Sequence, residues 1–379
     1  MKNNLIEETR LAAVNALKHC VKKTGIYASG TPEGYQAVFA RDAIISLLGG
    51  ALIDQKFKPA FKKSLITLSK NQAPNGQIPN AVGIYDPNYQ SKITYNTIDS
   101  SLWFIIGCHI YEKTYKEALP PKIKKSAENA FVWITYQDYS EEHLPAQLPT
   151  TDWQDAFPHK YGHTINTESL YYAVLLMTGK NREAKIVKDL VAGNKRPHLK
   201  LWDENRGYFL PWAWKDHDGD REEERWFDSL GNCLAILTGL ASPAQSKKIL
   251  RFIEKENINL PYPMKTIFPP IRPLSQLWKT YFEKSDAREP YHYLNGGVWP
   301  FIGGFYVAAL VKTKQLKKAR LALEKLAASN KIGRDREFEF NEWLDGRTGK
   351  PLGGIYQAWS IGMFLYAHEC VKTRKVPFF

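Results

Sequence analysis

The sequence predicts an all-α fold, specifically an (α/α)6 barrel in which two concentric layers of helices form a single domain over residues 1–379. Three observations support this prediction. Helical apolar spacing recurs from end to end, beginning with the stripe Leu11, Val14, Leu17 and Val21, whereas strand-like alternation is scarce. The helices also come in pairs, an apolar helix followed after a short turn by a Lys-rich amphipathic one. The apolar members are expected to form the inner layer and the Lys-rich members the outer layer.

The apolar periodicity predicts twelve helices, near residues 5–24, 41–54, 57–72, 97–115, 121–138, 165–178, 181–194, 228–241, 243–256, 296–313, 315–330 and 354–373. Pairing is clearest in 41–54 with 57–72 and in 296–313 with 315–330. The alternative is an open α-solenoid. Repeat arrays show self-similarity at a fixed short period, and the sequence has none, which favours the closed barrel.

Composition allows a large core and a lined cleft. The chain of 379 residues is longer than most domains, although continuous barrels reach this size as one unit. Hydrophobic residues make up 44% of the chain, and the 11 Trp and 20 Tyr exceed what an average core needs. We therefore expect a cleft with aromatic walls.

Charge favours a soluble protein over a nucleic-acid-binding one. The net charge of +13 comes largely from lysines scattered on helical stretches, such as Lys122, Lys124 and Lys125, which is typical of solvated helix faces. A nucleic-acid protein more often concentrates basic and aromatic residues in one patch, so we expect no nucleic-acid partner.

Cysteine and histidine usage argues against a metal site. The cysteines, Cys20, Cys108, Cys233 and Cys370, are far apart in apolar helical stretches and are expected to be buried free thiols. His159 and His163 form only a lone pair at i, i+4, so we expect no metal and no organic cofactor.

The beginning of the chain turns acidic and amphipathic where a signal peptide needs an apolar run, so a cytoplasmic location is expected. No segment reaches the roughly 18 uninterrupted apolar residues of a membrane span, and no membrane association is expected. The sequence leaves the oligomeric state open.

The longer connections carry the unusual residues, as expected for functional loops at one end of a barrel. Residues 73–96, 139–164, 195–227, 257–295 and 331–353 are rich in Pro, Gly, Asp, Trp and Tyr. A Gly-x-Ser-x-Gly elbow, a Walker loop and a Gly-x-Gly-x-x-Gly turn are all missing from the sequence. Paired carboxylates are the chemistry that remains.

The first candidate carboxylate is Glu342, in the stretch 341–349 that is followed by the Gly-rich residues 353–360. Aromatic faces stack on sugar rings while carboxylates and amides bind hydroxyls, so this composition suggests a sugar site with Glu342 as the catalytic base. The alternative is a C-terminal helix cap with core aromatics. Local sequence supports both interpretations equally.

The second candidate is in residues 150–157, where two acids flank Trp153. A carboxyl against an aromatic ring is partly desolvated, which raises its pKa and keeps it protonated, as a general acid requires. Asp155 is our candidate acid and Asp152 the local alternative. Only a closed fold brings Asp155 to Glu342, and a separation of roughly 6.5 to 9.5 Å between their carboxyls would predict inversion.

Four further groups are candidates for binding sugar hydroxyls and rings. They are Arg41 with Asp42, Asp99 with Trp103, Trp153 with Asn166 on the helix that follows, and Asn295 with Trp299. Structural alternatives remain open for each. Asp42 and Asp99 are also placed to complement helix dipoles, and the tryptophans are also suited to the core.

Several motifs in one order resemble a known family. They are residues 38–42 (Val-Phe-Ala-Arg-Asp), 98–103 (Ile-Asp-Ser-Ser-Leu-Trp), 230–232 (Leu-Gly-Asn), 243–245 (Pro-Ala-Gln), 295–300 and 342–360. From Tyr35 to about Leu365 the chain resembles the alkaline/neutral invertases of glycoside hydrolase family 100, within the six-hairpin (α/α)6 glycosidases. The resemblance implies an inverting hydrolase with Asp155 as acid and Glu342 as base. It also implies that Arg41, Asp42, Asp99, Trp299 and Gln357 face the sugar.

The acid loop departs from the invertase pattern. Asp155-Ala156-Phe157-Pro158 stands where those enzymes carry Asp-Arg-Arg, and Asn166 replaces a Glu. Residues 153–156 instead look like the Trp-Met-Asp-Ala of amylo-α-1,6-glucosidase domains. We therefore expect a small saccharide substrate with an α-glucosidic bond, sucrose first and an α-1,6-linked oligosaccharide as the alternative. A sugar epimerase using His163 and His292, or a non-catalytic sugar-binding barrel, are the other hypotheses.

Overall fold

The computed structural model describes residues 2–53, 55–84, 91–139, 141–193, 196–215 and 221–379. Within these ranges it contains twelve α-helices, and each corresponds to one predicted from the sequence. They are α1 (Lys2–Cys20), α2 (Ala40–Ile53), α3 (Lys58–Lys70), α4 (Asp99–Tyr115), α5 (Pro121–Thr135), α6 (Ile165–Met177), α7 (Asn181–Val191), α8 (Ser229–Thr238), α9 (Pro243–Lys255), α10 (Pro300–Lys312), α11 (Leu316–Lys331) and α12 (Ala358–Thr373).

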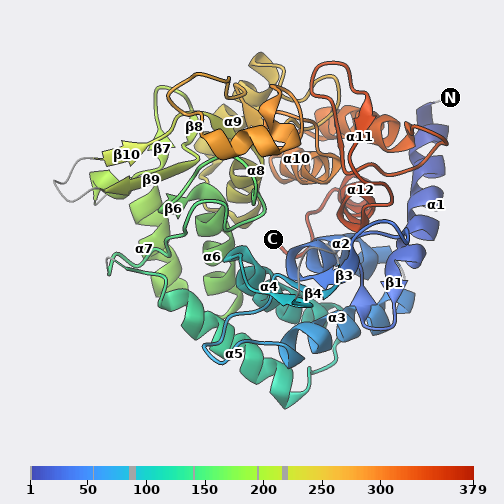
Figure 1. Ribbon diagram of the computed structural model, residues 1–379, viewed down its shortest axis with the longest axis horizontal. Coiled ribbons are helices and arrows are strands. Elements are labelled where there is room, and N and C mark those ends of the chain that lie inside the picture. Colours follow the sequence, from blue (N-terminus) through green and yellow to red (C-terminus); the bar gives the residue numbers. More distant parts are fainter. Residues whose placement is uncertain (1, 54, 85–90, 140, 194–195, 216–220) are drawn as a thin grey trace.

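The even-numbered helices form a closed inner ring, in which each of α2, α4, α6, α8, α10 and α12 packs against the next and α12 returns to α2 (Figure 1). Glycines make this closure possible. A Cβ on Gly49 would lie 2.0 Å from the carbonyl oxygen of Gly362, and one on Gly362 would lie 2.2 Å from that of Ser46. The first and last inner helices therefore meet backbone to backbone. The predicted (α/α)6 barrel is confirmed.

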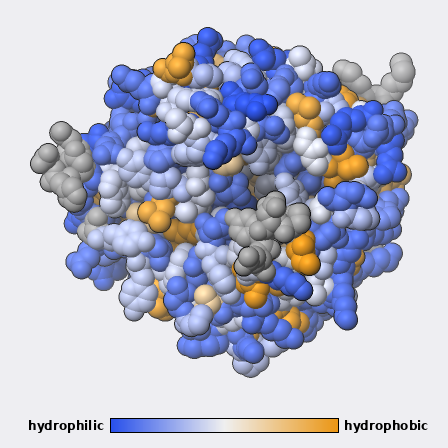
Figure 2. Space-filling view, viewed as in Figure 1, coloured by the Kyte–Doolittle hydropathy of each residue, from blue (hydrophilic) through white to orange (hydrophobic). Residues whose placement is uncertain are grey.

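The odd-numbered helices form the outer layer (Figure 1). Inner helix α8 is buried along its whole length, whereas outer helix α9 buries only Ser246, Ile249, Leu250 and Ile253, which share one face. The other face of α9 is directed away from the core. The molecular face seen in Figure 2 is mostly hydrophilic with small separate hydrophobic patches. The expected division into apolar inner and amphipathic outer members is confirmed.

Local signals fix some of the helix boundaries. Asp228 caps α8 by accepting a hydrogen bond from the Gly231 N–H, and Ser242 with Gln245 forms a capping box at the start of α9. The predicted starts at residues 296 and 354 are four residues too early. Val298 is instead held in extended bridges to Lys265 and Leu344 before α10 begins, so tertiary pairing overrides the apolar pattern there.

The connections contain short antiparallel strands. They are β1 (Val21–Lys22), β2 (Gly25–Ile26), β3 (Gln36–Phe39), β4 (Ala81–Ile84), β5 (Ile93–Thr94), β6 (His163–Thr164), β7 (Trp202–Asp203), β8 (Tyr208–Phe209), β9 (Trp212–Lys215), β10 (Arg221–Glu223), β11 (Phe227–Asp228), β12 (Ile267–Phe268), β13 (Trp343–Leu344) and β14 (Pro351–Leu352). The sheets β3-β4-β5 and β10-β9-β6 have three strands each, and Val38 pairs with Val82 in the first. These strands hold the loops that surround the site.

All four cysteines are buried free thiols, as predicted. Over the described residues, no helix combines the length and apolar character that crossing a membrane requires.

Candidate active site

A cavity of about 220 Å³ gathers residues from both ends of the chain. It is lined by Tyr35, Phe39, Arg41, Asp42, Asn80, Asn96, Trp153, Asp155, Tyr293, Trp299, Glu342, Gln357 and Trp359. These residues come from β3 and the residue before it, the start of α2, the connections around β4 and β5, the loop before α6, the segments that precede α10 and α12, and the first turn of α12. The two carboxylates predicted from the sequence, Asp155 and Glu342, thus share one cavity.

Glu342 is held on both carboxylate oxygens. The hydroxyl of Tyr35 donates to its Oε1 at 3.4 Å, and the backbone N–H of Gly354 donates to its Oε2 at 2.9 Å. The Glu342 N–H donates in turn to the Gly354 carbonyl at 2.8 Å, next to the β13–β14 pair. Glu342 is buried, with 7% of its surface exposed. This carboxylate is oriented by its own hairpin.

The turn beside Glu342 requires glycine. Gly353 has a φ of +70°, which a side chain disfavours. A Cβ there would lie 2.5 Å from the Trp343 ring and 2.7 Å from Glu342 Oε2. The Gly-rich sequence after Glu342 therefore serves close approach of the backbone to the carboxylate.

Asp155 lies in a loop whose ends are joined by paired backbone hydrogen bonds between Gln147 and Gly162, both 2.9 Å. The loop is also tied to the barrel, because the Ile98 N–H donates to the Thr151 carbonyl just before α4. Asp155 is solvent-accessible, in contrast to its neighbours Trp153 and Gln154. A ligand in the cavity can therefore reach the Asp155 carboxyl.

Burial and mutual repulsion raise the pKa of the carboxyls in this cavity. Asp155 is open to solvent through the cavity, but its carboxyl is surrounded by the protein atoms that line it, and this desolvation raises the pKa of Asp155 to about 6, with Arg41 opposing the rise. Burial also raises the pKa of Asp42 to about 6 and that of Glu342 to about 7. Asp42 and Asp155 add to the rise at Glu342, while the Gly354 N–H and Tyr35 lessen it. With pKa values of about 6 and about 7, these carboxyls gain and lose protons close to neutral pH, which acid–base chemistry requires.

Arg41 is the buried cation of the site. Its Nη1 contacts both oxygens of Asp99 at 3.1 and 3.2 Å, and its Nε lies 3.8 Å from Asp42. Burial acts to lower the pKa of Arg41, but Asp99 and Asp42 outweigh it, so the pKa is raised and the guanidinium stays charged. Asp42 therefore keeps a compensating charge beside it.

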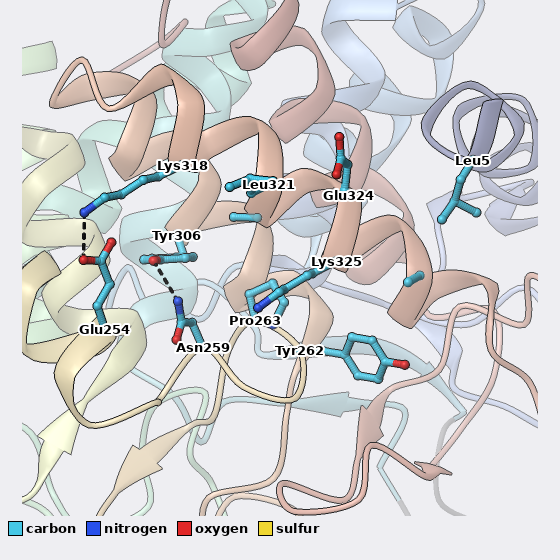
Figure 3. A pocket seen from close by; sticks show the side chains of 12 residues that line it. Leu5, Glu254, Asn259, Tyr262, Pro263, Tyr306, Lys318, Leu321, Glu324 and Lys325 are labelled. Atoms are coloured by element: carbon cyan, nitrogen blue, oxygen red, sulfur yellow. Dashed lines mark hydrogen bonds and ion pairs between the residues drawn. The ribbon is translucent and has the colours of Figure 1, made fainter. Parts of the chain in front are cut away.

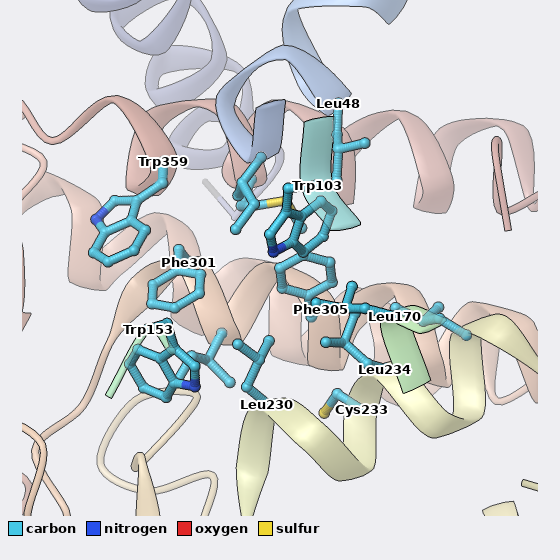
Figure 4. Close-up of a cluster of buried hydrophobic side chains, with 14 of the residues drawn as sticks. Leu48, Trp103, Trp153, Leu170, Leu230, Cys233, Leu234, Phe301, Phe305 and Trp359 are labelled. Carbon is cyan, nitrogen blue, oxygen red and sulfur yellow. The ribbon is translucent and has the colours of Figure 1, made fainter. Parts of the chain in front are cut away.

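Stacked aromatic rings form a hydrophobic cluster next to the cavity. Phe301 stacks on Trp359 with ring centroids 4.2 Å apart and an interplanar angle of 8°. Figure 4 shows Phe301 between Trp359 and Trp153, and its ring meets the Trp153 ring edge-on at 5.4 Å. Trp299 packs against Trp359 at 5.5 Å. The cavity thus combines aromatic walls with charged groups.

The main prediction names eleven site residues, without counting Asp152 and the histidines of the alternative hypotheses. Seven of the eleven line this cavity, namely Arg41, Asp42, Trp153, Asp155, Trp299, Glu342 and Gln357. The remaining four do not. Asp99 pairs with Arg41 from behind, and Trp103 packs against Phe305 within the core (Figure 4). Asn295 donates to the carbonyls of Ile271 and Ala287. Asn166 is buried in the first turn of α6, so these four residues lie outside the lining.

Six residues in the lining are not among the site residues predicted from the sequence: Tyr35, Phe39, Asn80, Asn96, Tyr293 and Trp359. Five of them flank the selected motifs closely, and the enrichment of aromatic and amide residues there was the available signal. Asn80 is different. Its side-chain oxygen accepts a hydrogen bond from the Thr97 hydroxyl at 3.2 Å, and the pairing of β4 with β3 and β5 brings it to the cavity.

A larger cavity, of about 520 Å³, lies between α9, α11 and the loop that contains Tyr262 (Figure 3). Its carboxylate Glu254 is paired with Lys318 at 2.7 Å, and the Tyr306 hydroxyl accepts from Asn259. None of the predicted site residues lines it.

The histidines of the epimerase hypothesis do not line the candidate site either. His163 lies 3.7 Å from buried Glu168, and His292 is paired with Asp345 at 3.0 Å. Within the described residues, no group of three or more His, Cys, Asp or Glu side chains is arranged to hold a metal ion.

Comparison with known families matches the chain in two parts. The family model "alkaline and neutral invertase" matches residues 196–374, and the model "amylo-alpha-1,6-glucosidase" matches residues 14–139. The C-terminal half of the chain is similar to alkaline/neutral invertases. The resemblance inferred from the motifs is thereby confirmed there, including the stretch around Glu342. Asp155 lies between the two matched ranges.

Plant invertases are among the similar proteins. An alkaline/neutral invertase of Arabidopsis thaliana is 36% identical over 154 residues, which are 39% of this chain and 26% of that protein. A cytosolic invertase of Oryza sativa subsp. japonica is 34% identical over 154 residues, with the same coverage of each chain. The chain therefore matches about a quarter of the length of these relatives.

Solved structures share the fold over nearly the whole chain. A GH63 mannosylglycerate hydrolase from Thermus thermophilus, in complex with Tris and D-glycerate, has a TM-score of 0.70 and 14% identity, and covers 94% of this chain and 99% of its own. A rhamnosidase from Klebsiella oxytoca with rhamnose bound has a TM-score of 0.63 and 13% identity, and covers 97% of this chain and 64% of its own. These similarities establish the barrel fold.

Proposed function

We propose that the protein is an inverting glycoside hydrolase that cleaves an α-glucosidic bond in a small saccharide, with sucrose as the first candidate. The observation that carries the proposal is that Asp155 and Glu342, far apart in sequence, line one cavity with Arg41, Asp42 and tryptophans. Glycoside hydrolases use two carboxyl groups as acid and base beside aromatic rings that bind the sugar, and both carboxyls here have raised pKa values. The similarity of residues 196–374 to invertases supports sucrose.

In this mechanism Asp155 donates its proton to the glycosidic oxygen as the bond to the anomeric carbon breaks. Its accessibility from the cavity and its pKa of about 6 suit a group that must hold a proton and meet a ligand. Glu342, in its ionised form and held by Tyr35 and Gly354, removes a proton from the water that attacks the opposite face. Because the pKa of Glu342, about 7, lies above that of Asp155, about 6, the reactive form with the proton on Asp155 is the less populated of the two singly protonated forms of the empty site. One proton leaves Asp155 and one reaches Glu342, so the charge of the pair is unchanged.

The other lining groups suit binding of a pyranose ring. Arg41 and Asp42 are a charged donor and acceptor for neighbouring hydroxyls. Asp42 Oδ2, Gln357 Nε2 and Trp359 Nε1 lack a hydrogen-bond partner among the described residues, which favours a ligand with many hydroxyls. The Trp299 and Trp359 rings line the cavity and offer apolar surface to the sugar ring, although Phe301 covers one face of Trp359.

The test is to incubate the purified protein with sucrose, isomaltose, maltose and trehalose and to measure released glucose. Release from sucrose is expected in the wild type, with a loss of about 10³-fold in Asp155→Asn and in Glu342→Gln. Glu128→Gln, on the surface of α5, is the matched control and should behave as the wild type. Cleavage of isomaltose alone would move the substrate to the α-1,6-glucosides, and no cleavage of any of the four sugars would refute the proposal.

A further inference from the structure

A buried lysine joins the two ends of the segment that carries the candidate acid. Lys160 is fully buried, and its Nζ lies 2.8 Å from Asp152 Oδ2, 2.5 Å from Gln154 Oε1 and 3.5 Å from Asp228 Oδ2. Asp152 and Gln154 stand on either side of Trp153, immediately before Asp155. Asp228 is the cap of α8, so Lys160 fastens the acid loop to an inner helix of the barrel.

The other contacts of these carboxylates are backbone groups of the same two segments. Asp152 Oδ1 accepts from the Gln154 N–H at 2.9 Å, and Asp228 Oδ1 accepts from the Gly231 N–H at 3.0 Å. Their second oxygens both turn to the Lys160 ammonium. Two buried carboxyl groups and one ammonium therefore meet at the base of the loop.

The permanent charge of Lys160 follows from this arrangement. Burial acts to lower its pKa, but Asp152 and Asp228 outweigh burial, and the pKa is raised. Burial raises the pKa of Asp228, and Lys160 opposes that rise. The ammonium lies between two carboxyl groups that, when ionised and without a cation, would repel each other.

Resting on the hydrolase function proposed above, we infer that Lys160 is a positioning residue for the general acid: it clamps Asp152, Gln154 and Asp228 and so keeps the Asp155 loop in place at all working pH values. No proton has to be taken up to hold the loop. The mechanism then requires only one protonated group on its acid side, Asp155 itself.

The charged and titratable groups around Asp155 are the background for this effect. They are Arg41 and Asp42 on α2, Asp99 on α4, Asp152 in the same loop, Glu342 before β13, and the phenols of Tyr35 and Tyr293. Lys160→Met changes none of these groups, and the variants that carry Asp152→Asn change only Asp152. Any added proton dependence is thereby assigned to the Asp152–Asp228 pair.

Replacing Lys160 by Met removes the cation between Asp152 and Asp228, so that a proton bound to one of the two carboxyls must take over its role. The two carboxylates can then stay together only while they share a proton, because like charges so close do not both ionise. In Lys160→Met, log kcat/KM should fall on the alkaline side with a slope of about −2, against about −1 in the wild type. Near pH 8 the loss should reach about 100-fold, with a smaller loss near pH 5.5.

Three variants serve as comparisons. Lys160→Met with Asp152→Asn removes the repulsion and should restore the slope of about −1. Asp152→Asn alone keeps Lys160 paired with Asp228 and removes a negative charge that faces Asp155, so its alkaline limb should move to lower pH. Lys125→Met, a lysine on the α5 surface with 69% of its side chain exposed, should match the wild type. If Lys160→Met does not fold, Lys160→Arg is the test: it keeps a cation between the two carboxylates, so the clamp predicts an alkaline slope of about −1, and a slope of about −2 would overturn it.

Thermal unfolding gives a readout that does not depend on activity. In Lys160→Met the shared proton raises the folded-state pKa of the carboxyl pair above its unfolded value, so stability is lost as pH rises through the folded pKa. Its Tm should therefore fall more steeply than that of the wild type between pH 5.5 and 8.5.

The outcomes separate the two proposals. An active wild type with an equal loss at every pH in Lys160→Met, and parallel Tm curves, would overturn the clamp and leave the hydrolase function standing. A wild type that cleaves none of the sugars would overturn the hydrolase function, and the Tm curves would still decide whether Lys160 replaces a proton.

Discussion

Replacing Glu342 by Gln should stabilise the folded protein at alkaline pH while removing its activity. The pKa of Glu342 rises from an ordinary 4.5 to about 7, which corresponds to roughly 3 kcal/mol lost by the folded state when the carboxyl ionises. The amide has one acceptor oxygen for the two donors that Glu342 now satisfies, Tyr35 and Gly354, which costs about 1 kcal/mol. A net gain of roughly 2 kcal/mol is expected.

The sign of the pH dependence follows from the direction of the shift. A folded-state pKa above the unfolded value means that the folded protein binds the proton more tightly, so wild-type stability falls as pH rises from about 4.5 to about 7. Above that range the cost is complete, and below it the cost is absent. The advantage of Glu342→Gln should therefore appear at pH 8.5 and vanish at pH 4.5.

Urea unfolding at these two pH values measures the difference, by linear extrapolation of the free energy of unfolding. Glu128→Gln, whose carboxylate is 66% exposed, is the control for an exchange of Glu to Gln and should show no such difference. The reasoning is refuted if Glu342→Gln and the wild type have the same pH dependence of unfolding. It is equally refuted if the variant keeps wild-type turnover.

Three other predictions follow from the site. Asp155→Asn should hydrolyse sucrose about 10³-fold more slowly than the wild type. It should hydrolyse α-glucosyl fluoride at close to the wild-type rate, because fluoride leaves without a proton, and a fluoride electrode measures this directly. Tyr35→Phe removes a hydrogen bond that favours ionised Glu342, so the acid limb of its pH–rate profile should move to higher pH, and an unmoved limb would contradict this role. Trp359→Leu should raise KM about 10-fold, whereas Trp103→Leu should lower the unfolding midpoint with KM nearly unchanged.

The helices were predictable because their signals are local. Ser242, Pro243 and Gln245 predict the start of α9 from four consecutive residues, and the helix begins at Pro243 in the structure. The same holds for the carboxylates, since their aromatic neighbours are adjacent in sequence. Asp155 and Glu342 line the same cavity because the barrel is closed, and closure of the barrel was itself predicted.

Depth within the barrel was not predictable from helical spacing. Trp103 shares a helix face with Asp99, and both are buried, yet it lies one turn further along α4, about 6 Å deeper, and packs in the core. The spacing gives the direction of a side chain but not where the cavity ends. Lys160 was missed for a related reason, because one of its carboxylates, Asp228, belongs to a distant helix cap.

The central claim is that Asp155 and Glu342 act as an acid and base on opposite faces of an α-glucoside. Proton NMR of the first glucose released from the cleaved sugar tests this most directly, recorded before mutarotation. The β-anomer should appear first, since attack by water from the opposite face inverts the anomeric carbon. Initial release of the α-anomer would contradict the proposed mechanism.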